Sequence, residues 1–219
     1  MDLRTSVLLA GMMTKPEIIP PEPYEKVDYI EGFGQQYIDT GISAPNGFRF
    51  EVCLNVLDGQ GRDTIVGSHN VSSPYERNFI SLNKISLMLE FGLGNNFPDI
   101  SAPPINSFFV LSGNTYNDGR NNILTLNDTT IYNSSSYSNG SRSANNLLLF
   151  TNQYYIANPY GSFLIAKMKY CKIWDNNDNL VRDMVAVHNN ISNQYGMYDN
   201  ISGQFFGNSG SGDFGGGND

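Results

Sequence analysis

A period of two in apolar and polar residues dominates the most regular part of the chain. The even positions from Phe48 to Val56 are all apolar, whereas Arg49, Glu51 and Asn55 alternate with them. Side chains of a β-strand point alternately to its two faces, so this pattern predicts a strand over 48–57 with one buried face. A second alternating run predicts another such strand over 84–91, with Ile85, Leu87, Leu89 and Phe91 inward.

Many shorter β-prone segments follow, separated by turns rich in Gly, Asn, Asp and Pro. They predict strands at 27–30, 36–40, 64–68, 78–82, 108–112, 122–126, 130–132 and 146–151. The run Ser162–Trp174 is long, and its inward face changes phase, which predicts a β-bulge near Tyr170–Lys172. The turn Asp175–Asn179 then leads into a strand over 180–187. Since no segment has a convincing helical period, we expect an all-β, two-sheet antiparallel sandwich of the jelly-roll kind.

Both ends of this predicted sandwich carry a family resemblance. Tyr29–Ile42 reads Tyr-Ile-Glu-Gly-Phe-Gly-Gln-Gln-Tyr-Ile-Asp-Thr-Gly-Ile, and Gly32 and Gly34 permit a tight turn or bulge in what looks like the opening edge of a sheet. The closing runs are Lys172-Ile-Trp-Asp, Asn179-Leu-Val-Arg-Asp, Gly196-Met-Tyr-Asp and Gly203-Gln-Phe-Phe-Gly-Asn. Together they resemble the concanavalin A-like lectin/glucanase (LamG-like) domains encoded by gut bacteria and their tailed phages. The resemblance implies the fold more than the function, because such sandwiches serve many functions.

The chain divides into four predicted parts. Residues 1–14 resemble the short leaders of phage-encoded relatives, and we predict an anchoring or oligomerisation peptide there. Its anchor residues would be Leu3, Arg4, Val7, Leu8 and Met12. Four prolines in 15–24 predict a stiff spacer. The sandwich would span 25–207, followed by a Gly-rich tail at 208–219 whose composition predicts disorder. Contact of the two ends with neighbouring chains, or packing on their own domain, are both open alternatives.

Composition narrows the function classes. Charged residues make up only 16% of the chain and the net charge is −8. An acidic chain lacks the basic footprint of nucleic-acid binding, and no apolar run is long enough for membrane insertion. A neutral polar surface instead suits contact with sugars or proteins. Cys53 and Cys171 lie in predicted strands and are predicted to be buried free thiols rather than a bridge.

Catalytic and metal-binding patterns are weak. The glucanase branch of the family carries Glu-x-Asp-x-x-Glu on one strand, but here Glu51 and Glu90 stand alone, so we expect no enzyme activity. His69 and His188 are interpreted as structural or loop-edge residues. The turn at 175–179 resembles the start of a calcium loop, but Leu180 and Ala186 replace its Gly and Glu, which favours a hairpin turn. We expect no cofactor, with a structural calcium ion on a loop rim left open.

Sugar contact has its best candidates in one Tyr/Asn-rich region. Aromatic faces stack on pyranoses, and nearby amides bind hydroxyls. The candidates are Tyr137, Asn152, Tyr154, Tyr155, Asn158 and Tyr160. The same composition equally predicts a protein–protein contact.

Three hypotheses follow. The first is a non-enzymatic phage virion protein, such as a head fibre, capsid decoration or tail-associated adhesin, at the virion surface. It would contact other virion proteins through the N-terminal peptide, form a homo-oligomer with a trimer favoured, and present the sandwich to a surface glycan. The second is a carbohydrate-binding module of a secreted or bacterial cell-surface protein. The third is a divergent glycoside hydrolase, which would need two facing carboxyl groups in a groove.

Overall fold

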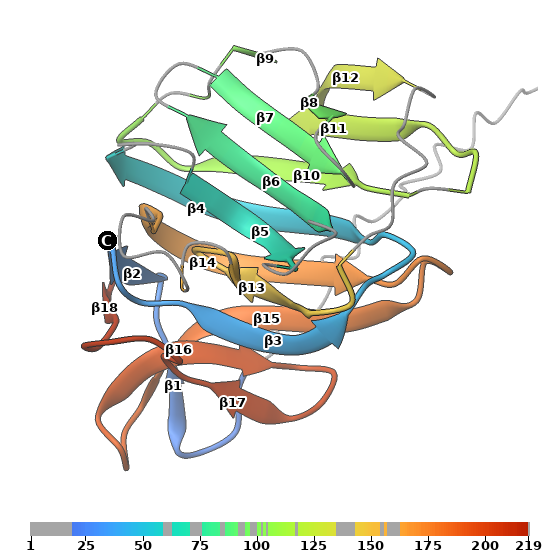
Figure 1. Cartoon of the computed structure of the whole chain (residues 1–219). Coiled ribbons are helices and arrows are strands. Elements are labelled where there is room, and N and C mark those ends of the chain that lie inside the picture. Colours follow the sequence, from blue (N-terminus) through green and yellow to red (C-terminus); the bar gives the residue numbers. More distant parts are fainter. Residues whose placement is uncertain are drawn as a thin grey trace, which may run out of the picture.

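The chain folds into two antiparallel β-sheets that lie face to face (Figure 1). The structure is a computed structural model, and it describes residues 19–58, 63–70, 76–83, 86–91, 95–96, 100–101, 103, 105–116, 118–134, 143–153, 156 and 163–218. The predicted all-β sandwich is confirmed in this part of the chain.

In the described part, the larger sheet has eleven strands and the smaller has seven. The main path of the larger sheet runs through β12 (Thr129–Ser134), β11 (Asn122–Leu126), β10 (Phe109–Asn114), β4 (Arg49–Asp58), β14 (Ile165–Trp174), β15 (Leu180–Asn189), β16 (Gln194–Asp199) and β17 (Gln204–Phe206). Three short strands complete it: β1 (Tyr24–Lys26) beside β15, β2 (Tyr29–Phe33) beside β14, and β18 (Gly215–Gly217) beside β2. The smaller sheet runs through β3 (Ile38–Ser43), β13 (Asn146–Leu149), β5 (Asp63–His69), β6 (Arg77–Asn83), β7 (Ser86–Phe91) and β8 (Asn95–Asn96), with β9 (Ile100–Ser101) also beside β7.

The core forms where the alternating residues of both sheets meet. In β4 and just before it, the even positions from Phe48 to Val56 are fully buried, as the period of two predicts. In β14, Ala166 and Met168 point inward, and after a register shift between Met168 and Tyr170 the inward positions become Cys171 and Ile173. The predicted bulge is confirmed, although it begins about one residue earlier than expected. It lets one strand keep apolar residues inside along its whole length.

The opening segment differs from its prediction in two ways. Gly32 lies within β2 and not in a turn. A Cβ atom there would lie only 3.1 Å from the ring of Phe150, so the packing of this ring favours glycine. Gly34, with a φ of +95°, is the glycine that turns the chain. Of the predicted strand 27–30, only Tyr29 and Ile30 lie in a strand, β2, while residues 27 and 28 connect β1 to it. Strand β2 is flanked on both sides, by β14 and β18, so it is not a sheet edge.

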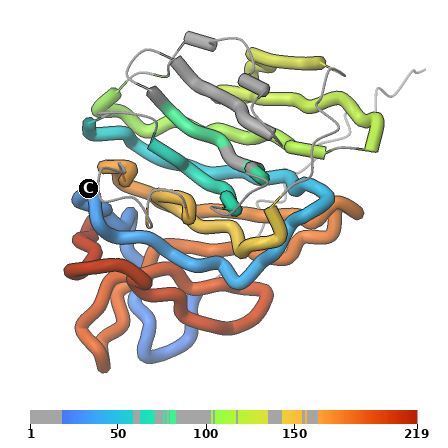
Figure 2. The backbone as a smooth tube through the Cα atoms, viewed as in Figure 1, coloured from blue at the N-terminus to red at the C-terminus, as the bar shows by residue number. Residues whose placement is uncertain are grey.

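The C-terminal tail is part of the sandwich. Strand β18 pairs with β2, and Phe214 is buried against Phe150 with their ring centroids 5.3 Å apart. Figure 2 shows the last segment returning beside the first strands. One aromatic side chain and backbone pairing hold a segment that otherwise lacks apolar residues and that the sequence-based boundary at 207 sets apart from the sandwich. Of the two alternatives for this end, the described tail shows packing on its own domain.

The N-terminal side of the described region also joins the sheet earlier than predicted. Tyr24 begins β1 within the expected spacer, and its ring packs on those of Tyr198 and Phe205, with centroids 5.0 and 5.5 Å away. The carbonyl oxygen of Pro23 accepts a hydrogen bond from the Asn190 backbone N–H. The predicted anchor residues Leu3, Arg4, Val7, Leu8 and Met12 lie outside the described residues, so the anchoring peptide stays a prediction.

Asp side chains in the closing runs of the sequence accept backbone hydrogen bonds and stabilise turns. The fully buried carboxylate of Asp199 accepts hydrogen bonds from the backbone N–H groups of Asp183 and Ser202 and lies 3.5 Å from the Arg182 guanidinium. The Asp175 carboxylate accepts the backbone N–H groups of Asn177 and Asn179. The predicted hairpin turn at 175–179 is confirmed. These carboxylates explain why both runs are rich in Asp and Asn.

The two cysteines are free thiols, as predicted. Cys171 is fully buried, and burial raises its pKa, so the thiol stays protonated. The pKa of Cys53 is also raised, chiefly by burial. Among the described residues, no helix is long and apolar enough to cross a lipid bilayer.

Candidate functional site

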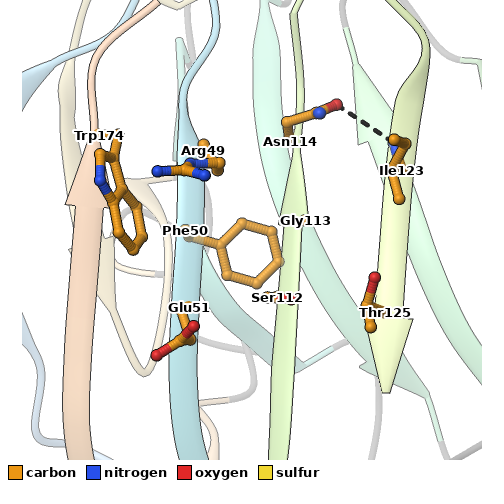
Figure 3. Close-up of a pocket in the computed structure, with 9 residues that line it drawn as sticks. All are labelled: Arg49, Phe50, Glu51, Ser112, Gly113, Asn114, Ile123, Thr125 and Trp174. Atoms are coloured by element: carbon orange, nitrogen blue, oxygen red, sulfur yellow. Dashed lines mark hydrogen bonds between the residues drawn. The ribbon is translucent and has the colours of Figure 1, made fainter. Parts of the chain in front are cut away.

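A pocket of about 270 Å³ opens on the outer face of the larger sheet, across four neighbouring strands (Figure 3). Its lining comes from β4, β10, β11 and β14: Arg49, Phe50, Glu51, Ser112, Gly113, Asn114, Ile123, Thr125 and Trp174. This volume is slightly below the range of about 300–1,000 Å³ typical of small-molecule sites.

Strand alternation places the lining side chains on the outer face of the sheet, except that of Phe50, which belongs to the core. Because the even positions of β4 are buried, Arg49 and Glu51 point to the opposite face. The register puts Trp174 and Asn114 on either side of Arg49. Gly113 lies in the floor, where a Cβ atom would be only 2.6 Å from the carbonyl oxygen of Ile123. A residue with a side chain could therefore not occupy this position without moving β11.

Arg49 and Trp174 form one wall of the pocket. The guanidinium carbon of Arg49 lies 3.9 Å from the indole centroid, a close cation–π contact. Figure 3 shows the Arg49 side chain extending from β4 toward the ring. The stacking limits the positions that the Arg49 side chain can adopt, so its planar donor group is partly ordered before any ligand arrives.

Glu51 lies below Arg49 and is paired on its other side. Lys172 Nζ donates a hydrogen bond to Glu51 Oε1 at 3.3 Å, and the Tyr170 hydroxyl also bonds to this carboxylate. Burial, and then the negative charge of Glu51, raise the pKa of Tyr170, so the phenol stays protonated as a donor. The positive charge of Lys172 offsets that of Glu51, the one carboxylate found among the described residues that line the pocket.

Asp178, close to the pocket residue Arg49, joins two connecting segments. Its carboxylate accepts a hydrogen bond from the Tyr116 hydroxyl at 2.6 Å and another from Arg120 at 2.9 Å. Arg120 also pairs with Asp118 and makes a cation–π contact with Tyr116, with its guanidinium carbon 3.4 Å from the ring centroid. This network ties the β14–β15 turn to the loop before β11 and makes a fixed rim.

Several polar groups in the pocket remain available. Asn114 uses its carbonyl oxygen to accept the Ile123 backbone N–H at 3.1 Å, which leaves its amide nitrogen unpaired within the described part of the chain. The hydroxyls of Ser112 and Thr125, both lining the pocket, also form no hydrogen bond with described residues. Amide and hydroxyl groups of this kind, beside an aromatic ring and the apolar Ile123, match the mixed polar and apolar surface of a sugar ring.

Of the sequence-predicted sugar contacts, the structure describes only Asn152, which does not line the pocket. Asn152 is 1% exposed, and its amide donates a hydrogen bond to Thr64 Oγ1 at 2.6 Å. Tyr137, Tyr154, Tyr155, Asn158 and Tyr160 lie outside the described residues, so the predicted aromatic surface stays a prediction. His188 lies at the end of β15 and contacts Asn190 and Asn193, while His69 is buried at the end of β5.

Sequence reasoning did not single out the pocket residues as a site. The alternation identifies Arg49 and Glu51 as the outward face of a strand, Glu51 also counts as a lone carboxylate without a catalytic partner, and Trp174 is part of a closing run. The available signal was their chemistry: Trp174 is the one tryptophan of the chain, and it directly follows a buried strand position. A tryptophan expected on the outer face of a sheet is a reason to look for a binding site.

The described residues offer limited chemistry for other functions. They contain no cluster of three or more His, Cys, Asp or Glu side chains that could hold a metal ion. A calcium ion elsewhere stays an open expectation. The pocket itself combines one neutralised carboxylate with donors and hydroxyls, an arrangement suited to reversible hydrogen bonding.

Fold and pocket together define a two-layer antiparallel β-sandwich with a polar pocket on its outer face. No family model matches the chain, and no curated protein matches it. Its structure resembles that of a Bacteroides ovatus protein with a provisional assignment to carbohydrate binding, with a TM-score of 0.60 and 15% identity over 86% of this chain. The match spans 59% of the B. ovatus chain. A weaker likeness, with a TM-score of 0.33 and 13% identity over 59% of this chain and 92% of the other, is to the carbohydrate-binding module CBM66 of Bacillus subtilis.

The first of these likenesses shows the fold and is consistent with a lectin-like jelly roll. It does not test the narrower LamG-like assignment or the phage origin, and both stay predictions from the sequence.

Proposed function

We propose that this domain binds carbohydrate without catalysis, through the pocket on the outer face of the larger sheet. The observation that carries the proposal is the pocket lining. An unpaired amide, two hydroxyls and a guanidinium surround an opening beside the sole tryptophan. These groups are the donors and acceptors that bind sugar hydroxyls.

The fold likeness to the B. ovatus protein supports the same class of function. It favours the carbohydrate-binding module over the virion protein among our hypotheses, since the B. ovatus protein carries a provisional assignment to carbohydrate binding. The virion role, the trimer and the location at a virion, secreted or cell surface remain predictions that depend on the leader at 1–14.

Binding without catalysis fits the state of Glu51. General acid–base cleavage of a glycoside uses two carboxyl groups, roughly 5–10 Å apart. Glu51 is the one carboxylate among the described lining residues, and Lys172 and Tyr170 occupy it. A single carboxyl group cannot supply both the acid and the second carboxylate that this mechanism needs.

A glycan array tests the proposal and its location. We expect the wild-type chain to bind at least one glycan, and Trp174→Ala to reduce that signal at least tenfold. The matched control Ile191→Ala, at an exposed turn position, should bind like the wild type. A triple Tyr154, Tyr155 and Tyr160→Ala variant addresses the alternative surface. If this triple variant loses the signal while Trp174→Ala keeps it, the pocket is not the binding site; if no glycan binds, the function is wrong.

A further inference from the structure

Arg49 is a cation that lacks a hydrogen-bonded acceptor. Its Nε atom is buried and makes no hydrogen bond, and the closest carboxylate oxygen, on Asp178, lies 3.7 Å from it. That separation is too long for a good hydrogen bond. No acceptor among the described residues forms a hydrogen bond with this guanidinium. A buried N–H donor without an acceptor is costly, so a ligand that supplies acceptors gains from binding there.

Both acidic neighbours of Arg49 are already engaged. Asp178 accepts from Tyr116 and Arg120, and Glu51 accepts from Lys172 and Tyr170. Neither carboxylate can turn toward Arg49 without breaking a shorter contact. The cations Lys172 and Arg120 partly offset the charges of Glu51 and Asp178, which reduces the repulsion that an incoming anion would meet in the pocket.

The shape of the donor group indicates the kind of acceptor. A guanidinium is planar and presents its N–H groups as a rigid fork, which a carboxylate matches with two parallel hydrogen bonds. Stacking on Trp174 fixes the plane of that fork. The remaining lining groups, Ser112, Asn114 and Thr125, are neutral and suit hydroxyls.

We propose that the pocket is specific for an acidic sugar, such as a uronic or sialic acid, and that Arg49 binds its carboxylate. This inference rests on the proposed function and names its ligand class. The neutral lining groups hold the ring hydroxyls, and Trp174 keeps the Arg49 fork in place.

Matched pairs of sugars test the inference on the full chain. The probes are methyl glucuronide against methyl glucoside, methyl galacturonide against methyl galactoside, and the methyl glycoside of N-acetylneuraminic acid against its methyl ester. Titrations followed by calorimetry or NMR give the affinities. We expect at least one acid to bind tenfold or more tightly than its neutral partner, and this preference to shrink as salt is raised from 20 to 500 mM.

Three variants separate the fork from simple charge. Arg49→Gln should abolish the preference for the acid, and Arg49→Lys, which keeps the charge, should lose most of it. Lys26→Gln removes one positive charge from β1, outside the pocket, and should leave the preference unchanged. Thermal melts of each variant confirm that it is folded.

The outcomes separate this inference from the proposed function. Equal binding of acids and neutral sugars, or a preference that survives in folded Arg49→Gln, overturns the acidic-sugar assignment while leaving sugar binding in place. Absence of binding by every probe and by a glycan array would instead remove the proposed function as well.

Discussion

Replacing Phe214 tests whether the Gly-rich tail belongs to the core. Phe214 is 3% exposed, and its ring packs at 5.3 Å from that of Phe150. Truncating a buried Phe to Ala costs about 3–5 kcal/mol in the free energy of unfolding. Because β18 contributes only three residues of pairing near the chain end, where the backbone can adjust, we expect the lower limit, about 3 kcal/mol. For a domain of this size that corresponds to a melting temperature lower by about 6–12 °C.

Urea and thermal unfolding followed by circular dichroism measure this loss. Ile201→Ala is the matched control, since Ile201 is 51% exposed and its truncation should change stability by no more than about 0.5 kcal/mol. A loss below about 1 kcal/mol for Phe214→Ala would refute the packing of the tail, because cavity formation in a real core costs more.

Three further outcomes follow from the packing and the titrating groups. Gly196→Ala should destabilise the domain by about 1–3 kcal/mol in urea unfolding, because the new Cβ atom would lie 2.6 Å from the Phe206 carbonyl oxygen. The control Gly217→Ala should be tolerated, since its Cβ atom would lie 3.6 Å from the nearest atom. Equal effects of the two substitutions would contradict the β16–β17 geometry. Hydrogen bonds from Arg120 and Asn179 lower the pKa values of Asp118 and Asp175, so both acids stabilise the fold above about pH 4 and less as the pH falls below it. Melting temperatures should therefore drop between pH 5 and 2.5, and drop less in Asp118→Asn/Asp175→Asn. Because burial raises the pKa values of Cys53 and Cys171, a thiol reagent at pH 8 should label them only after denaturation, and fast labelling of the native chain would show that they are accessible.

Much of the fold could be predicted because side-chain alternation is a local property. The inward residues of β4, the phase change in β14 and the hairpin turn after Trp174 all follow from the order of neighbouring residues. The tail strand could not be predicted in this way. Glycines carry no side chain to alternate, and the pairing of β18 with β2 joins residues at opposite ends of the chain.

The pocket was harder to predict for a related reason. Arg49, Asn114 and Trp174 are far apart in sequence and become neighbours only through the register of β4 with β10 and β14. The search for sugar contacts favoured a Tyr/Asn-rich segment, since composition is the signal that a single sequence offers. Asn152 shows the weakness of that signal, because its amide is used inside the domain by Thr64.

The sole tryptophan makes the central claim directly measurable. Trp174 lines the pocket, so its fluorescence reports on the proposed site without any label. Titrating the wild-type chain with the glycan that binds best on the array should give a saturable change in Trp174 emission, and the affinity should agree with calorimetry. Calorimetric binding with an unchanged Trp174 signal would place the ligand elsewhere and contradict the account.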